Sequence, residues 1–351
     1  MSVLDIYAGP VAKQKIQEQG FNPELFSTFL GASGGPKWFT LFGLDKYLFG
    51  EFFKDKQSSL DLIGSSAGAF RASCLAQKDP VSAITELAYR YSETDFTLDA
   101  SPQGVTRAAE QLLTQILPHD HMQQVLNNER FKVHFITALC SGAVAKESKL
   151  HQGAGLTKSL INNALGRQRL TQQYQRVVFS TSKQALKYQE ASVFCTEYVD
   201  LTEQNFHQAL LASGAIPMVM LGIKDIPGAP AGMYRDGGII DYHFDFKIES
   251  EGLTLYPHFN SRPKAGWFDK NLKRTANPNN YDSTVMLVPS QEFVSGLPFS
   301  KIPDRTDFEK IDTSTRIRYW HNVFEQTERL AESFSNAVNK PETAIIKDLP
   351  F

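Results

Sequence analysis

The sequence has few cysteines, and they show no spacing pattern. Cys74, Cys140 and Cys195 are the 3 cysteines in a chain of 351 residues, and no two of them form a C-x-x-C pair. Such spacing indicates neither a disulfide framework nor a zinc site. We therefore expect a protein of a reducing compartment, with no metal held by cysteine.

Neither sign of charge is in excess. Lysine and arginine number 36 and aspartate and glutamate 38, so the formal net charge is -2 at pH 7. A balance of this kind gives no argument for a nucleic-acid partner or for strong attraction to anionic lipid. The net charge therefore indicates neither a nucleic-acid-binding protein nor a protein held at anionic membranes by charge.

Long hydrophobic runs are also missing. No window approaches the roughly 20 apolar residues that a membrane-spanning helix needs, and the first residues, Met1–Tyr7, lack the basic and apolar regions of a signal peptide. We expect a cytoplasmic protein that is at most peripheral to a membrane. Phenylalanine, in contrast, is abundant, with 25 residues. Most are expected in the core, and the rest are available for a lipid-facing surface.

Strand-like and helix-like segments alternate along the chain. Expected strands cover 59–63, 131–140, 176–180, 192–195, 232–235, 253–257 and 284–289, and expected helices cover 38–53, 67–77, 106–117, 121–126, 206–213 and 314–338. A polar, mobile insertion is expected over 149–170 and a loop over 261–282. This alternation predicts one α/β domain over 1–351 with a mostly parallel sheet. No linker divides it.

Gly64-Ser65-Ser66-Ala67-Gly68 reads as a sharp turn between a strand and a helix. A G-x-S-x-G pentapeptide in that setting is the nucleophile elbow of serine hydrolases, which exposes its central serine. Ser66 is therefore the candidate nucleophile. The alternative is that small residues here merely allow a strand and a helix to pack closely.

A glycine-rich loop, Gly31–Lys37, precedes the next expected helix. Successive N–H groups at Gly34 and Gly35, at the start of a helix, form a concave site for developing negative charge. Pro36 has no N–H to donate, and Lys37 either favours an anion or is solvated. The loop lacks the G-x-x-x-x-G-K-[ST] spacing of a nucleotide site, so a structural turn is the remaining alternative.

Asp236-Gly237-Gly238 follows an expected strand and offers a carboxylate as the proton acceptor for a serine. Alone, this tripeptide is a common turn. A triad is an open alternative, because His243, His258 and His321 all follow Asp236, and His258 is the best placed of the three. A dyad fits better. The elbow of an α/β-hydrolase triad follows several strands, whereas Ser66 follows little more than one strand and a glycine loop.

One compact cluster has residue types that bind metals. Asp241, His243 and Asp245 alternate, which puts all three on one face of an extended segment. No fourth ligand lies nearby in the sequence, so we interpret the cluster as a solvated polar face and expect no metal.

In their order along the chain, these motifs resemble those of the patatin-like phospholipases, lipid acyl hydrolases that use a Ser–Asp dyad. The corresponding segments here are Ser33–Trp38 for the oxyanion loop, Gly64–Gly68 for the nucleophile turn, Ala212–Pro217 for an Ala-Ser-x-Ala-x-Pro stretch, and Asp236–Gly238. The motif-bearing core covers about 25–245, and 246–351 is expected to complete the same domain. Ser33 and Trp38 depart from the family, which has glycine at both positions.

The resemblance implies a three-layer α/β/α fold and a serine lipid acyl hydrolase, either a phospholipase or an esterase. It assigns Ser66 as nucleophile and Asp236 as base, with Gly34, Gly35 and Lys37 around the oxyanion. It implies no cofactor, no metal and no nucleic acid; the partner is a lipid or another fatty-acyl ester, with peripheral membrane contact. Two alternatives stay open: an acyltransferase on the same dyad, and a non-catalytic lipid-binding protein of the same fold.

Overall fold

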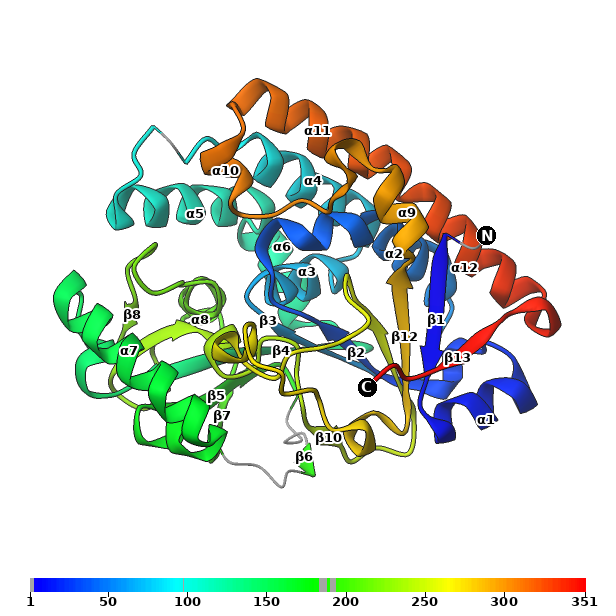
Figure 1. Cartoon of the computed structure of the whole chain (residues 1–351), viewed down its shortest axis with the longest axis horizontal. Coiled ribbons are helices and arrows are strands. Elements are labelled where there is room, and N and C mark those ends of the chain that lie inside the picture. Colours follow the sequence, from blue (N-terminus) through cyan, green and yellow to red (C-terminus); the bar gives the residue numbers. More distant parts are fainter. Residues whose placement is uncertain (1–2, 97, 183–187, 190–193) are drawn as a thin grey trace.

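The computed structural model describes residues 3–96, 98–182, 188–189 and 194–351. A mostly parallel mixed sheet lies at the centre and helices flank it, which confirms the predicted three-layer α/β/α fold (Figure 1). Within the described ranges no helix is long and apolar enough to cross a membrane.

The central sheet has the strand order β13-β1-β12-β11-β2-β3-β4-β5-β7, and β8 and β9 extend it beside β4. Its strands are β1 (Leu4–Ala8), β2 (Phe26–Gly31), β3 (Leu60–Ser65), β4 (Phe131–Cys140), β5 (Tyr174–Ser180), β7 (Thr196–Asp200), β8 (Ile223–Lys224), β9 (Met233–Asp236), β11 (Leu253–Pro257), β12 (Thr284–Pro289) and β13 (Ile346–Asp348). A small second sheet pairs β6 (Tyr188–Gln189) with β10 (Lys247–Ile248).

The α-helices of the described residues are α1 (Pro10–Gln19), α2 (Phe42–Tyr47), α3 (Ala67–Leu75), α4 (Pro80–Glu93), α5 (Pro102–Ile116), α6 (His119–Leu126), α7 (Lys149–Leu165), α8 (Phe206–Ser213), α9 (Gln291–Gly296), α10 (Asp307–Lys310), α11 (Thr313–Gln326) and α12 (Glu328–Asn339). Of these, α2, α3, α4, α11 and α12 form one connected layer. A buried ion pair joins two of its members, because Arg71 of α3 donates two hydrogen bonds to Asp45 of α2.

Phenylalanine rings fill the space between this layer and the sheet. Phe29 on β2 packs edge-on against Phe49, and Phe49 in turn contacts Phe131 on β4. Edge-to-face pairs of this kind add to the apolar area that each ring buries. Among the large exposed apolar residues, phenylalanine is represented by Phe299. Core packing therefore explains most of the phenylalanine bias.

The register of three strands brings two loops together. β3 runs parallel to β4 as far as the pair Ser65–Ile136, and β9 runs antiparallel to β4 from the pair Thr137–Asp236. Because β5 occupies the opposite edge of β4 over the same residues, β3 and β9 must share one edge. Their carboxyl-terminal ends therefore meet end to end, directly before Ser66 and at Asp236.

One sequence prediction is wrong over 149–170, where the structure has α7 followed by a 3-10 turn (Arg167–Gln172) instead of a mobile insertion. The buried face of α7 is polar and small. Its Ser159 Oγ lies 2.8 Å from the hydroxyl of Tyr174, and Asn163 donates to Asp269. Since apolar periodicity marks an ordinary surface helix, a helix whose buried face is polar escapes that test.

Other boundaries differ in smaller ways. The expected helix 38–53 begins as a 3-10 turn (Gly35–Leu41), continues as α2 and ends in a π turn (Leu48–Phe52). The expected helix 314–338 is divided at Thr327, whose hydroxyl accepts the N–H of Gly43. Of the expected strand 192–195, residues 192–193 lie outside the described residues, and β7 begins at Thr196. The sequence reading also omitted β1, α1 and α4.

Candidate active site

Ser66 occupies a strained turn between β3 and α3. Its φ of 54° and ψ of -127° lie in a region that residues with a side chain rarely adopt. The turn is possible because Gly68 packs directly on β2: a Cβ at Gly68 would lie 1.7 Å from the carbonyl oxygen of Gly31. The sequence left close packing and a functional serine as alternatives; in the structure the close packing is present, and the same turn places Ser66 in the wall of a cavity.

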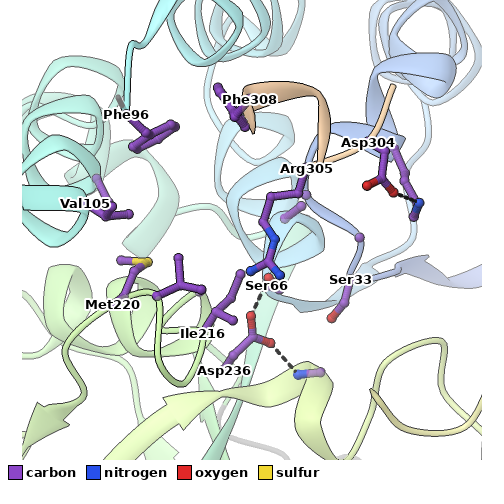
Figure 2. A pocket seen from close by; sticks show the side chains of 18 of the residues that line it. Ser33, Ser66, Phe96, Val105, Ile216, Met220, Asp236, Asp304, Arg305 and Phe308 are labelled. Carbon is purple, nitrogen blue, oxygen red and sulfur yellow. Dashed lines mark hydrogen bonds and ion pairs between the residues drawn. The ribbon is translucent and has the colours of Figure 1, made fainter. Parts of the chain in front are cut away.

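Ser66 and Asp236 are joined by a hydrogen bond. The Ser66 hydroxyl donates to Oδ2 of Asp236 at 2.8 Å, and the N–H of Gly238 donates to Oδ1 at 2.7 Å (Figure 2). Both side chains are largely buried. Burial raises the pKa of Asp236 to about 6, against the opposing effect of these two hydrogen bonds. A carboxylate with that pKa is a stronger base than one in water.

The stretch Ala212–Pro217 holds both members of this pair. The N–H of Ser66 donates to Ser213 Oγ at 3.0 Å, and that hydroxyl donates to the carbonyl of Ile136 at 2.7 Å. The N–H of Asp236 donates to the carbonyl of Ala215 at 3.0 Å. The residue types of this stretch do not by themselves indicate a function. Its role in positioning Ser66 and Asp236 depends on contacts that form only in the folded protein.

The glycine loop after β2 lies at the same end of the sheet. Gly34 and Gly35 line the cavity that also contains Ser66, and Gly35 has a φ of 54°, which glycine adopts without strain. Among the hydrogen bonds of the described ranges, neither glycine N–H has a partner. Two N–H groups are thus available for an oxyanion.

The two departures from the family pattern have defined places. Ser33 is buried, and its Oγ lies 2.8 Å from Oγ of Ser65 and so ties the glycine loop to β3. Trp38 is 1% exposed and packs against Phe39, with 4.9 Å between ring centroids. Trp38 also lines the cavity. Lys37 forms an ion pair with Asp304, and its side chain is partly exposed to solvent.

A cavity of about 710 Å³ opens beside Ser66 and Asp236. Much of its wall is apolar, and Figure 2 shows Phe96, Val105, Ile216, Met220 and Phe308 around it. Such a volume, with a few polar groups at one end, is typical of a site for a largely apolar ligand. A fatty-acyl chain has this character.

The histidines that allowed a triad lie elsewhere. His258 is buried and stacks on Phe259, and its Nδ1 accepts the N–H of Asn260. Burial lowers the pKa of His258 to about 3, so the ring is neutral. No hydrogen bond within the described residues joins a histidine to Ser66 or Asp236. The geometry pairs the serine with the carboxylate.

The cluster Asp241, His243 and Asp245 is not the solvated face that we expected. Asp241 is buried and accepts two hydrogen bonds from Arg176, and His243 is buried against His258. Asp245 accepts from the N–H of Asn277. Asp241, His243 and Asp245 thus each contact a different partner. The part of the chain described here contains no group of three or more His, Cys, Asp or Glu side chains able to hold a metal ion.

Of the comparisons with known proteins, the family model is the one that identifies a family. The family model for patatin-like phospholipase matches residues 62–243. Among solved structures, human GIVD cytosolic phospholipase A2 has a TM-score of 0.40 at 10% identity, over 94% of this chain and 62% of that protein. VipD from Legionella pneumophila has a TM-score of 0.35 at 14% identity, over 95% of this chain and 70% of that one. No curated protein matches the sequence. Because the family model covers just over half of the chain and includes both Ser66 and Asp236, this chain belongs to the patatin-like phospholipase family.

Proposed function

We propose that this protein is a serine hydrolase that cleaves fatty-acyl esters of lipids through an acyl-enzyme on the dyad Ser66 and Asp236. The observation that carries the proposal is the 2.8 Å hydrogen bond from Ser66 Oγ to Asp236 beside an apolar cavity. A nucleophile within hydrogen-bond reach of a base is the geometry that covalent catalysis needs.

In the first half of the reaction, Ser66 Oγ attacks the acyl carbonyl and Asp236 accepts its proton. The N–H groups of Gly34 and Gly35 hold the oxyanion of the tetrahedral intermediate; losing one such donor typically costs ~100- to 1000-fold in rate. As the intermediate collapses, Asp236 returns the proton to the leaving alcohol. The ion pair with Asp304 holds the Lys37 ammonium in position, and with it the glycine loop that carries the two N–H groups.

In the second half, Asp236 activates a water molecule, which attacks the acyl-enzyme. The fatty acid leaves and the proton returns to Ser66. One carboxylate performs both proton transfers, and its pKa of about 6 supports this, because a base is most effective when its pKa is near the working pH.

The test is labelling with a fluorophosphonate probe followed by mass-spectrometric mapping of the modified residue. We expect label on Ser66 and loss of hydrolysis of p-nitrophenyl hexanoate in Ser66→Ala and Asp236→Asn. A buried serine outside the cavity, Ser73, supplies the matched control Ser73→Ala, which should keep its activity. Full activity in either dyad variant would contradict the proposal.

The same experiments separate the two alternatives. If Ser66 does not react with the probe, the chain is a lipid-binding protein that has lost catalysis. If Ser66 is labelled but glycerol in the assay collects the acyl group as an ester, the acceptor is an alcohol and the protein is an acyltransferase. Free fatty acid as the product supports hydrolysis.

Peripheral contact with a membrane is part of the proposal. The solvent face of α7 carries Leu150, Ile161 and Leu165, which share one side of the helix by its periodicity. The helix reaches the cavity rim, because Gln152 accepts the N–H of Met218, a residue of the cavity wall. Exposed apolar side chains at the rim of a lipid site favour an interface with a bilayer.

Three free thiols favour the cytoplasm, a reducing compartment.

Co-sedimentation with vesicles tests the contact. We expect the protein to pellet with phosphatidylcholine vesicles, and a variant with glutamine at Leu150, Ile161 and Leu165 to stay in the supernatant while keeping activity on a soluble ester. Ile345→Gln replaces an equally exposed residue beside β13, at the other edge of the sheet, and should pellet as before. If the protein pellets with neither neutral nor anionic vesicles, the proposed membrane contact is wrong.

A further inference from the structure

The glycine loop has few backbone donors for an oxyanion. Pro36 has no N–H, and the N–H groups of Ser33 and Lys37 already donate to backbone carbonyls, at 3.0 and 3.3 Å. Gly34 and Gly35 supply the remaining N–H groups of this segment. Because an oxyanion has three lone pairs, it can accept a further hydrogen bond from a donor outside the loop.

The hydroxyl of Tyr91 lies beside this loop. Tyr91 is on α4 and lines the cavity together with Gly35 and Ser66. Its Oη is 3.4 Å from the point that a Cβ at Gly35 would occupy, and that point is two bonds away from the N–H nitrogen of Gly35. The hydroxyl is therefore close to one of the two backbone donors.

This hydroxyl has no partner within the protein. Among the hydrogen bonds of the described residues, none involves Oη of Tyr91. Its contacts are made by the ring, whose centroid lies 5.6 Å from that of Phe39 and 6.3 Å from those of Phe96 and Phe308. A tyrosine hydroxyl inside a protein usually has a hydrogen-bond partner. Here the donor is available to a molecule in the cavity.

Tyr91 is neutral in the working pH range of the dyad. Burial raises the pKa of Tyr91 to about 12, against the opposing charges of Arg305 and Arg316. The charge of Asp236 also raises it, which indicates that the dyad lies close enough to Tyr91 for the two groups to interact. A neutral hydroxyl can donate to an oxyanion, whereas a phenolate would repel one.

We propose that the Tyr91 hydroxyl donates a third hydrogen bond to the oxyanion, beside the N–H groups of Gly34 and Gly35. The inference rests on the proposed function, because the oxyanion forms only when Ser66 attacks an acyl carbonyl. Tyrosine hydroxyls can serve as oxyanion donors in the same way as backbone N–H groups. Since aromatic contacts hold the ring, the hydroxyl is in position before the substrate binds.

Removing the hydroxyl alone tests this role. Tyr91→Phe keeps the ring and its contacts, and it breaks no hydrogen bond of the described residues. We expect kcat for p-nitrophenyl hexanoate to fall about 100-fold. KM should stay unchanged, because the donor serves acylation and deacylation alike. Tyr89→Phe is the matched control, since Tyr89 is on the same helix, 38% exposed and outside the cavity wall. This variant should keep full activity.

Two ketones distinguish an oxyanion donor from a structural residue. With trifluoromethyl pentyl ketone, Ser66 Oγ adds to the carbonyl carbon, Asp236 takes the hydroxyl proton, and the carbonyl oxygen becomes an oxyanion. Methyl pentyl ketone has the same alkyl chain but is far less electrophilic and binds without this addition. In Tyr91→Phe, the inhibition constant of the trifluoromethyl ketone should rise by the factor by which kcat/KM falls, and that of the methyl ketone should change far less.

The outcomes are distinct. An unchanged kcat/KM in Tyr91→Phe would overturn the inference and leave the proposed function standing. Equal weakening of both ketones would make Tyr91 a residue of the cavity wall without a role at the oxyanion. A wild-type protein that does not hydrolyse the ester contradicts the proposed function, and the third donor is then wrong as well.

Discussion

At the scale of single residues, the burial of Asp236 sets the pH range of the reaction. A base acts in its ionised form, and its pKa is raised to about 6. We therefore expect kcat/KM for p-nitrophenyl hexanoate to be constant above neutrality and to fall about tenfold per pH unit below pH ~6. A pH profile between pH 4.5 and 8.5 measures this. A break near pH 4 would mean that Asp236 is a solvated carboxylate.

The same pKa predicts an effect of Asp236 on stability. Because the value is raised on folding, from 3.8 to about 6, the folded state prefers the neutral acid. Stability is full below the unfolded pKa and declines as the pH rises through about 6. The ionised form then costs about 3 kcal/mol as an upper estimate.

Asp236→Asn removes that cost, since an amide keeps the acceptor for Gly238 and places its NH₂ toward Ser66. We expect the variant to be inactive yet more stable than the wild type at pH 8, by roughly 1–3 kcal/mol, with the difference shrinking toward pH 5. Urea denaturation at the two pH values measures it. A variant that is less stable at pH 8 would show that ionised Asp236 stabilises the fold.

Individual residues divide into those that the sequence reveals and those that it does not. Ser66, Asp236, Gly34 and Gly35 stand in local motifs whose chemistry requires those residue types, and the structure brings these four to one cavity. Tyr91 has no motif. A tyrosine on a helix is usually a packing residue, and nothing local distinguishes this one. Its position beside Gly35 follows from contacts of residues distant in sequence.

At the scale of elements, the C-terminal end of α8 decides how accurately the dyad is placed. Ser213 satisfies the N–H of Ser66 and the carbonyl of Ile136 at once. Ser213→Ala leaves both buried groups without a partner, at a cost of ~1–3 kcal/mol for each. We expect kcat to fall with little change in KM, because the hydroxyl holds the nucleophile and does not line the cavity.

Ser73→Ala is the control for this prediction. Ser73 is equally buried, on the neighbouring helix α3, and donates to the carbonyl of Phe70. The Ser73→Ala variant should have a lower Tm than the wild type and an unchanged kcat. Steady-state kinetics together with thermal unfolding distinguish the two serines, and equal kinetic effects would show that Ser213 acts only through stability.

Elements differ in how well the sequence predicts them, for a physical reason. Strands rich in apolar residues, such as Phe131–Cys140 and Thr284–Pro289, have the predicted bounds. The helix α7 was missed because its buried positions include Gln152, Gly155 and Asn163, which hydrogen bonds satisfy in place of apolar contacts.

At the scale of the whole molecule, both ends of the chain belong to one sheet. β1 pairs with β12 on one side and with β13 on the other, and β11 lies between β12 and β2. The segment 246–351 therefore supplies strands in the middle of the order, and its Asp304 holds the glycine loop through Lys37. This interleaving supports the proposal that 1–351 is a single domain.

A single domain of this kind should unfold in one transition. Trp38 reports on the motif-bearing part and Trp320 on the C-terminal part, and both are buried. In two variants that each keep one of them, with phenylalanine at the other tryptophans, we expect the fluorescence and far-UV circular dichroism midpoints in urea to coincide. Separate midpoints for the two reporters would divide the chain near residue 245. A truncated chain 1–245 should also fail to fold, because removing β11 and β12 leaves one edge of β2 with unpaired backbone groups and β1 without its neighbours.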